Sequence, residues 1–228
     1  MCFSATASFT ASFTLIGAGI YCLNIARGLE KPYWLLALVP LLFGLQQFLE
    51  GIVWLNGVAQ CTNSARSPAL GYLFFSHLFW LFWIPLSCYA VESNLIKRQI
   101  FLALTFAGAL YGLSMYTPLL FTEGWMTVVL TEKSIIYKTV LLHDQYIPRK
   151  LLTLIYILII ISPLSAASDP YLNHFGFLVL GAVVVTALFF NYAFISKWCY
   201  FSAVFSLFIV YIFFRKKAAA NKIISLPD

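Results

Sequence analysis

Residues 33–57 read YWLLALVPLLFGLQQFLEGIVWLNG and contain a single charged side chain, Glu50. A helix of about 20 mostly apolar residues crosses the hydrocarbon core of a bilayer, which is roughly 30 Å thick. This stretch is long enough to do so, because each helical residue adds about 1.5 Å. We therefore predict that residues 33–57 form a transmembrane helix with one carboxyl group inside the membrane.

The composition of the whole chain agrees with a membrane protein. Of its 228 residues, 62% are hydrophobic and only 10% are charged, whereas soluble domains usually carry about 25% charged residues. So few charges would not solvate the surface of a soluble enzyme or of a nucleic-acid-binding domain, and the apolar content excludes a disordered chain. We expect the chain to have the lipid bilayer as its partner and to bind no nucleic acid.

Seven apolar blocks of membrane-spanning length, or close to it, follow one another along the chain. They cover approximately residues 9–26, 33–57, 69–91, 99–121, 151–167, 172–192 and 198–214. The alternating strands of a membrane β-barrel are absent. The sequence therefore predicts an all-α fold, a polytopic bundle of about seven transmembrane helices. It would form one domain over residues 1–214, followed by a basic cytoplasmic tail at 215–228.

Two connections carry structural signals of their own. Asp169 and Pro170 are typical of a helix start, with the carboxylate as capping acceptor and the proline in the first turn. The longest connection, residues 122–150, is rich in Val, Ile, Thr and Tyr around Glu132 and Lys133. We expect two short strands here, which form a small external β-hairpin between the fourth and fifth helices, although a surface helix would also fit. Such a hairpin would be either a lid over a binding site or a structured loop.

Basic residues indicate the orientation of the bundle. With the N-terminus outside, eight Lys and Arg residues fall on the cytoplasmic side and six outside. Four of these six lie in the long 122–150 connection, and basic residues in long loops have less influence on the orientation of a membrane protein. We therefore expect an N-out, C-in topology, with Arg215, Lys216 and Lys217 as a cytoplasmic cluster that binds anionic lipid. The first nine residues contain no Lys or Arg, so we expect the first block to be a permanent helix and not a cleaved signal peptide.

Glu50 is the one charged residue that we place in the middle of an apolar block. We expect every Lys and Arg to lie at a block end or in a connection, so that Glu50 has no basic partner within the membrane. An ionised carboxylate near the bilayer centre costs roughly 3 kcal/mol, so Glu50 should be protonated, strongly hydrogen-bonded or bound to a cation. Gln46, Gln47 and Trp54 lie within four positions of Glu50 and share its helical face.

The next apolar block offers a second candidate group. His77 is the only histidine in the middle of a block, and Trp80 follows it by three positions. From the helical rise, Glu50 lies about 10 Å and His77 about 12 Å below the outer surface, so the two side chains could touch. We expect an outward-facing polar pocket ringed by Trp54, Trp80 and Trp83. Further polar side chains that would reach its level are Tyr111, Ser114, Tyr116, Asn191, Tyr192 and Lys197.

Three functions fit this predicted site. The first, which we favour, is a binding, sensing or transport protein in which Glu50 and His77 hold a small ligand, a proton or a cation. The second is a metal-dependent, hydrolase-like intramembrane enzyme with Glu50, His77 and Cys2 as ligands of a divalent metal. In the third, the chain is a structural or assembly subunit and the polar pair only sets the packing. Cys2 and Cys61 would both lie outside, where a disulfide is an alternative to two free thiols.

Three segments carry a resemblance to a known family. MCFSATASF at residues 1–9, QQFLEGIVW at 46–54 and SHLFW at 76–80 resemble an uncharacterised family of bacterial multipass membrane proteins. This resemblance implies an integral protein of the bacterial inner membrane, and the family has no assigned activity. A looser similarity to seven-helix intramembrane hydrolases of the ceramidase and progestin-receptor type implies zinc held by paired histidines on a late helix. The last three blocks contain only His174.

Overall fold

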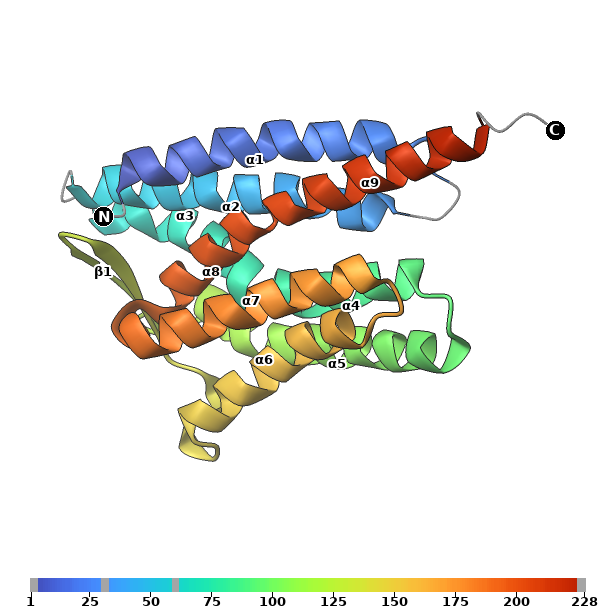
Figure 1. The fold of residues 1–228 in the computed structure, drawn as a ribbon. Coiled ribbons are helices and arrows are strands. Elements are labelled where there is room, and N and C mark those ends of the chain that lie inside the picture. Colours follow the sequence, from blue (N-terminus) through green and yellow to red (C-terminus); the bar gives the residue numbers. More distant parts are fainter. Residues whose placement is uncertain (1–3, 30–32, 59–61, 225–228) are drawn as a thin grey trace.

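The chain is almost entirely helical in the computed structural model, which describes residues 4–29, 33–58 and 62–224 (Figure 1). The α-helices are α1 (Ala5–Ala26), α2 (Trp34–Val58), α3 (Thr62–Leu73), α4 (Trp80–Val91), α5 (Leu95–Phe121), α6 (Arg149–Ala166), α7 (Pro170–Phe189), α8 (Phe194–Phe205) and α9 (Leu207–Ile224). A π-helical segment, Phe74–Phe79, joins α3 to α4, and short 3₁₀ turns at Leu142–Gln145 and Asn191–Ala193 precede α6 and α8. Strands β1 (Met126–Thr131) and β2 (Ser134–Thr139) lie between α5 and α6.

Seven helical segments of the described chain are long and apolar enough to cross a membrane. They are Ala5–Ala26, Trp34–Gly57, Ala65–Val91, Leu95–Phe121, Arg149–Ala166, Pro170–Phe189 and Asn191–Ala219. This finding confirms the predicted all-α bundle of about seven spans. The last segment extends beyond the predicted block 198–214 at both ends, and α9 runs through the first residues of the predicted basic tail.

The helices are arranged in two layers (Figure 1). One layer holds α1, α2, α3 and α9, the other holds α4, α5, α6 and α7, and α8 lies between them and contacts α1, α2, α7 and β2. The close packing of α1 on α2 depends on a glycine: a Cβ atom on Gly19 would lie 2.4 Å from Cβ of Leu41. Small residues allow membrane helices to approach in this way, because lipid provides no hydrophobic force that drives helices together.

The predicted β-hairpin is present. β1 and β2 pair antiparallel, with Thr131 opposite Ser134, so that Glu132 and Lys133 form the turn. The apolar face of the hairpin packs on the ends of α2, α3 and α5. The buried residues of this contact, which we call the hairpin cluster, include Val53, Trp54, Tyr72, Leu73, Leu119, Met126, Ile135 and Tyr137. The hairpin is therefore anchored to the bundle by buried side chains, and its turn lies near α8.

The predicted helix start at Asp169 is also confirmed. Asp169 accepts a 2.9 Å hydrogen bond from the backbone N–H of Tyr171, and Pro170 occupies the first turn of α7. The second carboxylate oxygen of Asp169 pairs with Nζ of Lys216 at 2.5 Å, and Nζ of Lys216 also donates to the hydroxyl of Tyr33 at 3.2 Å. Lys216, one of the three basic residues that we assigned to anionic lipid, thus ties α9 to α7 and to the residue before α2.

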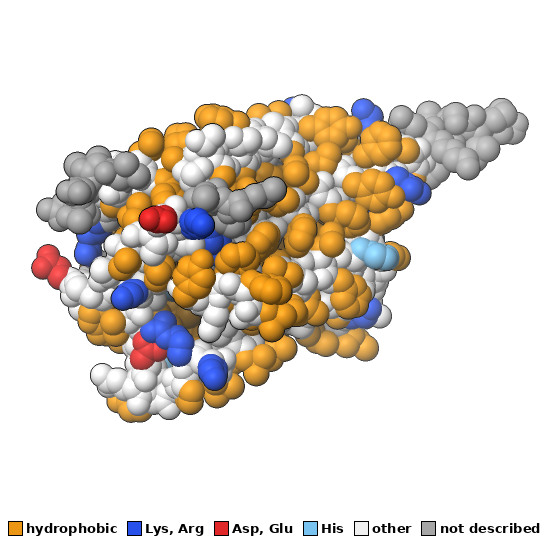
Figure 2. Space-filling model, turned by 60° about the vertical axis from the view of Figure 1, so that its left-hand side comes forward, with side chains coloured by type: hydrophobic (Ala, Val, Ile, Leu, Met, Phe, Trp, Pro, Cys, Tyr) orange, Lys and Arg blue, Asp and Glu red, His pale blue; other side chains and the backbone are white. Residues whose placement is uncertain are grey.

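The surface distribution of charge fits a membrane protein. Figure 2 shows one face of the molecule, on which Lys, Arg, Asp and Glu side chains lie towards the two ends and hydrophobic side chains cover most of the surface between them. Large exposed apolar residues on α5 and α7, such as Phe106, Leu110, Phe177 and Leu188, contribute to the apolar surface. Seven apolar helices and this band of hydrophobic side chains identify an integral, multi-pass membrane protein.

Candidate functional site

Glu50 lies in the interior of the bundle, where its carboxyl group meets α8. The residue is only 2% exposed, and its Oε1 accepts a 2.6 Å hydrogen bond from Oγ of Ser196. The side chains of Gln47, on the same helix, and Tyr72, on α3, approach the same carboxyl group. Polar groups from three helices therefore surround Glu50, as the cost of burying a carboxyl group requires.

Lys197 corrects one of our expectations. We predicted that Glu50 would have no basic partner, but Lys197 on α8 is 1% exposed and interacts electrostatically with Glu50. Its Nζ donates a 2.8 Å hydrogen bond to the backbone carbonyl of Lys133 in the hairpin turn. The prediction was wrong because the last span begins near Asn191 and not at residue 198, which places Lys197 within it. The long apolar stem of lysine then allows its ammonium group to extend towards the hairpin.

Gln46 links the Glu50 helix to the first turn of α4. It is fully buried, and its Oε1 accepts a 2.8 Å hydrogen bond from Nε1 of Trp80. The Trp80 ring stacks on Phe43, with ring centroids 4.0 Å apart. Gln46 and Trp80, two residues of the predicted site, therefore contact each other directly.

Several polar atoms beside Glu50 have no hydrogen-bond partner among the described residues. They are Nε2 of Gln46, both side-chain polar atoms of Gln47 and the hydroxyl of Tyr72. Each is shielded from the surface, and leaving a buried polar group unpaired costs about 1–3 kcal/mol. Because most buried polar groups in proteins are satisfied, such a group of unpaired atoms around one carboxyl is typical of a place where water or a ligand binds. We refer to Gln46, Gln47, Glu50, Tyr72, Ser196 and Lys197 as the Glu50 cluster.

His77 lies in different surroundings. It belongs to the π-helical segment, in which the backbone N–H of Trp80 bonds to the carbonyl of Phe75, and such segments frequently occur at functional sites. The Nδ1 atom of His77 lies 3.0 Å from Oγ of Ser76, and the hydroxyl of Tyr156 donates a 2.5 Å hydrogen bond to the carbonyl of Ser76. The wider turn therefore holds His77 and frees the Ser76 carbonyl to accept a bond from α6.

The contacts of Glu50 and His77 within the described chain do not join the two residues. His77 lines a cavity of about 90 Å³ together with Tyr111 and Arg149, whereas Glu50 is absent from the described lining of that cavity. We expected the two side chains to share one pocket. The structure instead shows a carboxyl cluster centred on α2 and α8 and a neighbouring cavity that contains the histidine.

The tryptophans of the predicted ring make different contacts, although Trp80 and Trp83 both pack against the ring of Phe79. Trp54 is buried in the hairpin cluster, and Trp80 lines a small cavity between the layers. Trp83 stacks on Phe79 at 4.9 Å between ring centroids, and its Nε1 donates to the carbonyl of Leu35 at 3.2 Å. The three rings therefore brace different helix contacts.

The other polar side chains that we expected at this level mostly bond to nearby backbone. The hydroxyl of Tyr111 donates to the carbonyl of Leu152 at 3.0 Å, and that of Tyr116 donates to the carbonyl of Leu70 at 3.2 Å. Tyr192 lies 3.3 Å from the hydroxyl of Ser134, which connects the start of α8 to the hairpin. Ser114 bonds within its own helix, and Asn191 begins a 3₁₀ turn.

A metal site of the predicted kind would need Cys2, which lies outside the described residues, as does Cys61. Within the part of the chain that the structure describes, no group of three or more His, Cys, Asp or Glu side chains is arranged to hold a metal ion. His174 is exposed and its Nδ1 contacts the carbonyl of Pro170 at 2.5 Å. The metal-dependent hypothesis therefore depends on Cys2, about which the described residues give no information.

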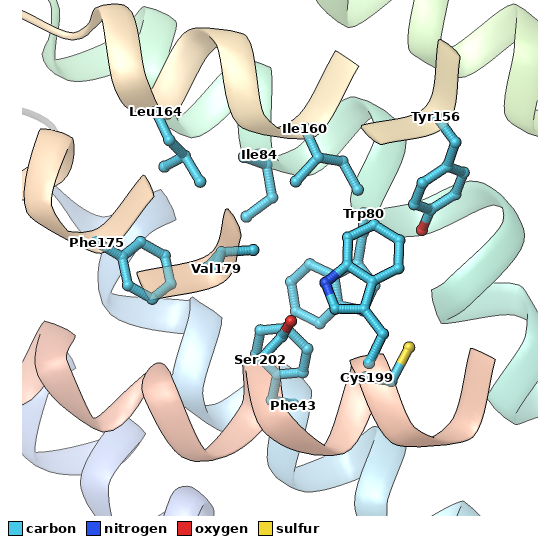
Figure 3. Close-up of a pocket in the computed structure, with 11 residues that line it drawn as sticks. Phe43, Trp80, Ile84, Tyr156, Ile160, Leu164, Phe175, Val179, Cys199 and Ser202 are labelled. Atoms are coloured by element: carbon cyan, nitrogen blue, oxygen red, sulfur yellow. The ribbon is translucent and has the colours of Figure 1, made fainter. Parts of the chain in front are cut away.

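Helix α8 contributes polar side chains to this region that we did not predict from the sequence. Cys199 and Ser202 point from α8 towards Trp80 in a cavity of about 30 Å³ between the layers (Figure 3). The Cys199 side chain also lies near Tyr72 and Gln46, so it separates the Glu50 cluster from this cavity. The signal in the sequence was weak: Ser196, Cys199 and Ser202 are small residues spaced three apart, in or next to the last apolar block, which packing alone would explain equally well.

Comparison with known proteins gives one match. A family model described as a family of unknown function (DUF6629) matches residues 1–224. No curated protein and no solved structure matches the chain. The match confirms a resemblance to a family without an assigned activity and extends it over nearly the whole chain.

Proposed function

The chain belongs to this family of unknown function, and we propose that it is a membrane protein that binds and releases a proton at Glu50, either to sense or to move it. The observation that carries this proposal is the burial of the Glu50 carboxyl beside a hydroxyl donor, a lysine and unpaired polar atoms. Ionisable residues inside membrane bundles are costly and commonly mark proton or ion pathways.

The unpaired atoms favour proton exchange over a purely structural role for Glu50. A carboxyl group that only fixed the packing would be expected to satisfy its neighbours, yet both polar atoms of the Gln47 side chain and the hydroxyl of Tyr72 lack partners among the described residues. One or two water molecules would satisfy these atoms and would carry a proton to or from the carboxyl group.

Lys197 provides a route from protonation to movement. When Glu50 is ionised, the lysine is attracted towards α2, while its ammonium group also bonds the hairpin turn at Lys133. Protonation of Glu50 removes this attraction, while the contacts of the ammonium group with the hairpin carbonyl and with the ring of Phe190, 6.0 Å from Nζ to the ring centroid, remain. The position of Lys197, and with it the contact between α8 and the hairpin, would then respond to the protonation state of Glu50.

The proposed setting of this activity is the bacterial inner membrane. In an N-out, C-in orientation the hairpin would be external, residues 215–228 would be cytoplasmic, and the basic residues there would face anionic lipid. The Glu50 cluster would then lie in the outer half of the bundle, close to the hairpin. Protons would enter from the external side.

Infrared difference spectroscopy tests the proposal directly. The protein in lipid nanodiscs is compared at two pH values, and we expect a carboxyl C=O band that appears on acidification and is absent from Glu50→Gln. The matched control is Glu123→Gln, which removes an exposed carboxyl group and should leave the band unchanged. If the spectra of Glu50→Gln and of the unmodified protein are identical across the pH range, Glu50 does not exchange a proton and the packing role stands.

A flux assay separates sensing from transport. The protein is placed in liposomes that contain a pH-sensitive dye, and a pH gradient is applied across the membrane. Dye response that depends on Glu50 indicates proton movement, whereas an infrared change without flux indicates a sensor.

A further inference from the structure

The cavity that contains His77 is a separate candidate binding site. It has a volume of about 90 Å³, and its walls come from the π-helical segment, α5, α6 and α8. Glu50 is not among its described lining residues, so the function proposed for the Glu50 cluster does not account for this cavity. Its position at the start of α6, below the end of the hairpin, gives it access to the surface through the exposed residue Arg149.

The polar end of this cavity carries a positive charge. Arg149 is the only charged residue among its described lining residues, and no carboxylate is among them. Nη2 of Arg149 donates to the carbonyl of Thr139 at 2.7 Å and also pairs with Asp144. Both described contacts use the same nitrogen atom, and a guanidinium group has five N–H donors. Donors therefore remain for an anionic group, which Arg binds in preference to a neutral one.

Most of the surface of this cavity is apolar, and the polar side chains that line it besides Arg149 are Ser76, His77, Tyr111, Thr153 and Tyr156. Met115, Leu152, Phe194 and Ile195 form its side walls. If the charged end of a ligand lies at Arg149, the rest of the ligand therefore meets a mainly apolar surface.

The cavity continues towards a deeper one. Tyr156, Trp198 and Cys199 line both this cavity and the smaller one of about 30 Å³ between the layers, whose other walls are apolar apart from Ser202 (Figure 3). Nε1 of Trp198 is buried and has no acceptor among the described residues. The inner end thus offers apolar surface and one unused donor.

We propose that this cavity binds a small monocarboxylate with an apolar chain. The carboxylate would lie against Arg149 near His77, and the chain would extend along Met115 and Phe194 towards Trp198. A cavity of about 150 Å³ accommodates benzene, with six carbon atoms, so this cavity of about 90 Å³ and the deeper one of about 30 Å³ together fit a chain of roughly four or five carbons. The positive charge of Arg149 would repel a cationic ligand. Inorganic phosphate could pair with Arg149 but has no apolar group to contact the apolar walls of the cavity.

Calorimetric titration of the full chain in nanodiscs provides the test, with pentanoate as the probe and empty nanodiscs as the blank. We expect saturable binding of pentanoate, and binding of pentanol, which has the same chain length but no charge, at least about tenfold weaker because the Arg149 contact is lost. Arg149→Gln should weaken pentanoate binding by a similar factor. Lys150→Gln, which removes the neighbouring positive charge outside the cavity, should leave the affinity unchanged.

A second variant keeps the proposal falsifiable if Arg149→Gln fails to fold. Met115→Trp fills the cavity without altering its charge and should abolish pentanoate binding while the helical circular dichroism signal is retained. The comparison of pentanoate with pentanol needs no variant at all. The proposal is overturned if the folded protein shows no saturable pentanoate binding, if pentanol binds as tightly, or if Lys150→Gln has the same effect as Arg149→Gln.

Discussion

Ser196 on α8 donates a 2.6 Å hydrogen bond to Oε1 of Glu50 on α2, which joins residues 146 positions apart in the sequence. The contact places the start of the last span against the second span, although four spans lie between them along the chain. The Glu50 cluster therefore forms only when the C-terminal part of the bundle has packed onto the N-terminal part.

Removal of this hydrogen bond should measurably destabilise the protein. Ser196→Ala leaves a buried carboxyl group without its hydroxyl donor, so we expect the free energy of unfolding to fall by about 1–3 kcal/mol. The measurement is equilibrium unfolding in mixed micelles of increasing denaturing detergent content. Ser87→Ala is the matched control, because Ser87 is equally buried but donates to the carbonyl of Trp83 within its own helix. An equal loss in both variants would show that the contact between α2 and α8 contributes nothing specific.

Glu50 and Lys197 should be energetically coupled. Lys197→Met keeps an unbranched apolar side chain but removes the charge that attracts Glu50, so we expect the free energy of unfolding to fall by about 1–3 kcal/mol. In the double variant with Glu50→Gln no unpaired charge remains, so we expect the combined loss to be smaller than the sum of the two single losses. Unfolding of the four proteins in a double-mutant cycle measures this difference.

The cycle also tests whether Lys197 is a basic partner of Glu50. Effects that add to within about 0.5 kcal/mol are typical of independent sites. Additivity would mean that the lysine acts through its other contacts, such as the carbonyl of Lys133, and that it is not coupled to Glu50.

The sequence predicted the helices and the hairpin because their signals are local. Apolar blocks of the length of a bilayer require helices. The turn residues Glu132 and Lys133 between two runs rich in β-branched residues predicted the hairpin, and Asp169 with Pro170 predicted the start of α7. Each of these features depends on residues within a few positions of one another.

The site was predicted only in part because its contacts are not local. Glu50, Gln46 and Trp80 were identified as polar or aromatic side chains in apolar blocks, and Trp80 does contact Gln46. The partner Ser196 gives no such signal, because a lone serine in an apolar helix is common in packing interfaces. The separation of Glu50 from the cavity of His77 follows from the tertiary packing of α8, which no pattern within a single helix can reveal.

The packing of α4 on α5 should depend on Gly108. A Cβ atom at this position would lie 2.1 Å from the backbone carbonyl oxygen of Leu81, so one of the two helices must shift. We expect Gly108→Ala to lower the free energy of unfolding by about 1–3 kcal/mol. Gly181→Ala is the control, because no atom lies within 4 Å of its added Cβ and alanine favours a helix by about 1 kcal/mol over glycine. Equal stability of the two variants in the same detergent titration would contradict the close approach of α4 and α5.

Glu92 connects two loops at one end of the bundle. Its Oε1 accepts hydrogen bonds from the backbone N–H groups of Ser93 and Asn94, both at 2.8 Å, and its Oε2 accepts one from that of Ser168 at 2.9 Å. The loop between α4 and α5 is thereby fastened to the loop between α6 and α7. Burial raises the pKa of this carboxyl, but the N–H donors of Asn94, Ser168 and Ser93 outweigh burial and hold the pKa below its ordinary value of 4.5.

The stabilisation from Glu92 should therefore depend on pH. Because the folded pKa lies below the unfolded one, the stabilisation is complete above the unfolded value and is lost as the pH falls through the folded value. Glu92→Gln keeps one acceptor oxygen but turns an amide NH₂ towards one of the N–H donors, so we expect a loss of about 1–3 kcal/mol at neutral pH that shrinks in acid. Unfolding is measured across this range, with Glu123→Gln as the control, because Glu123 is exposed and makes no described hydrogen bond. A loss that stays constant down to the lowest pH would show that the negative charge of Glu92 does not hold the two loops together.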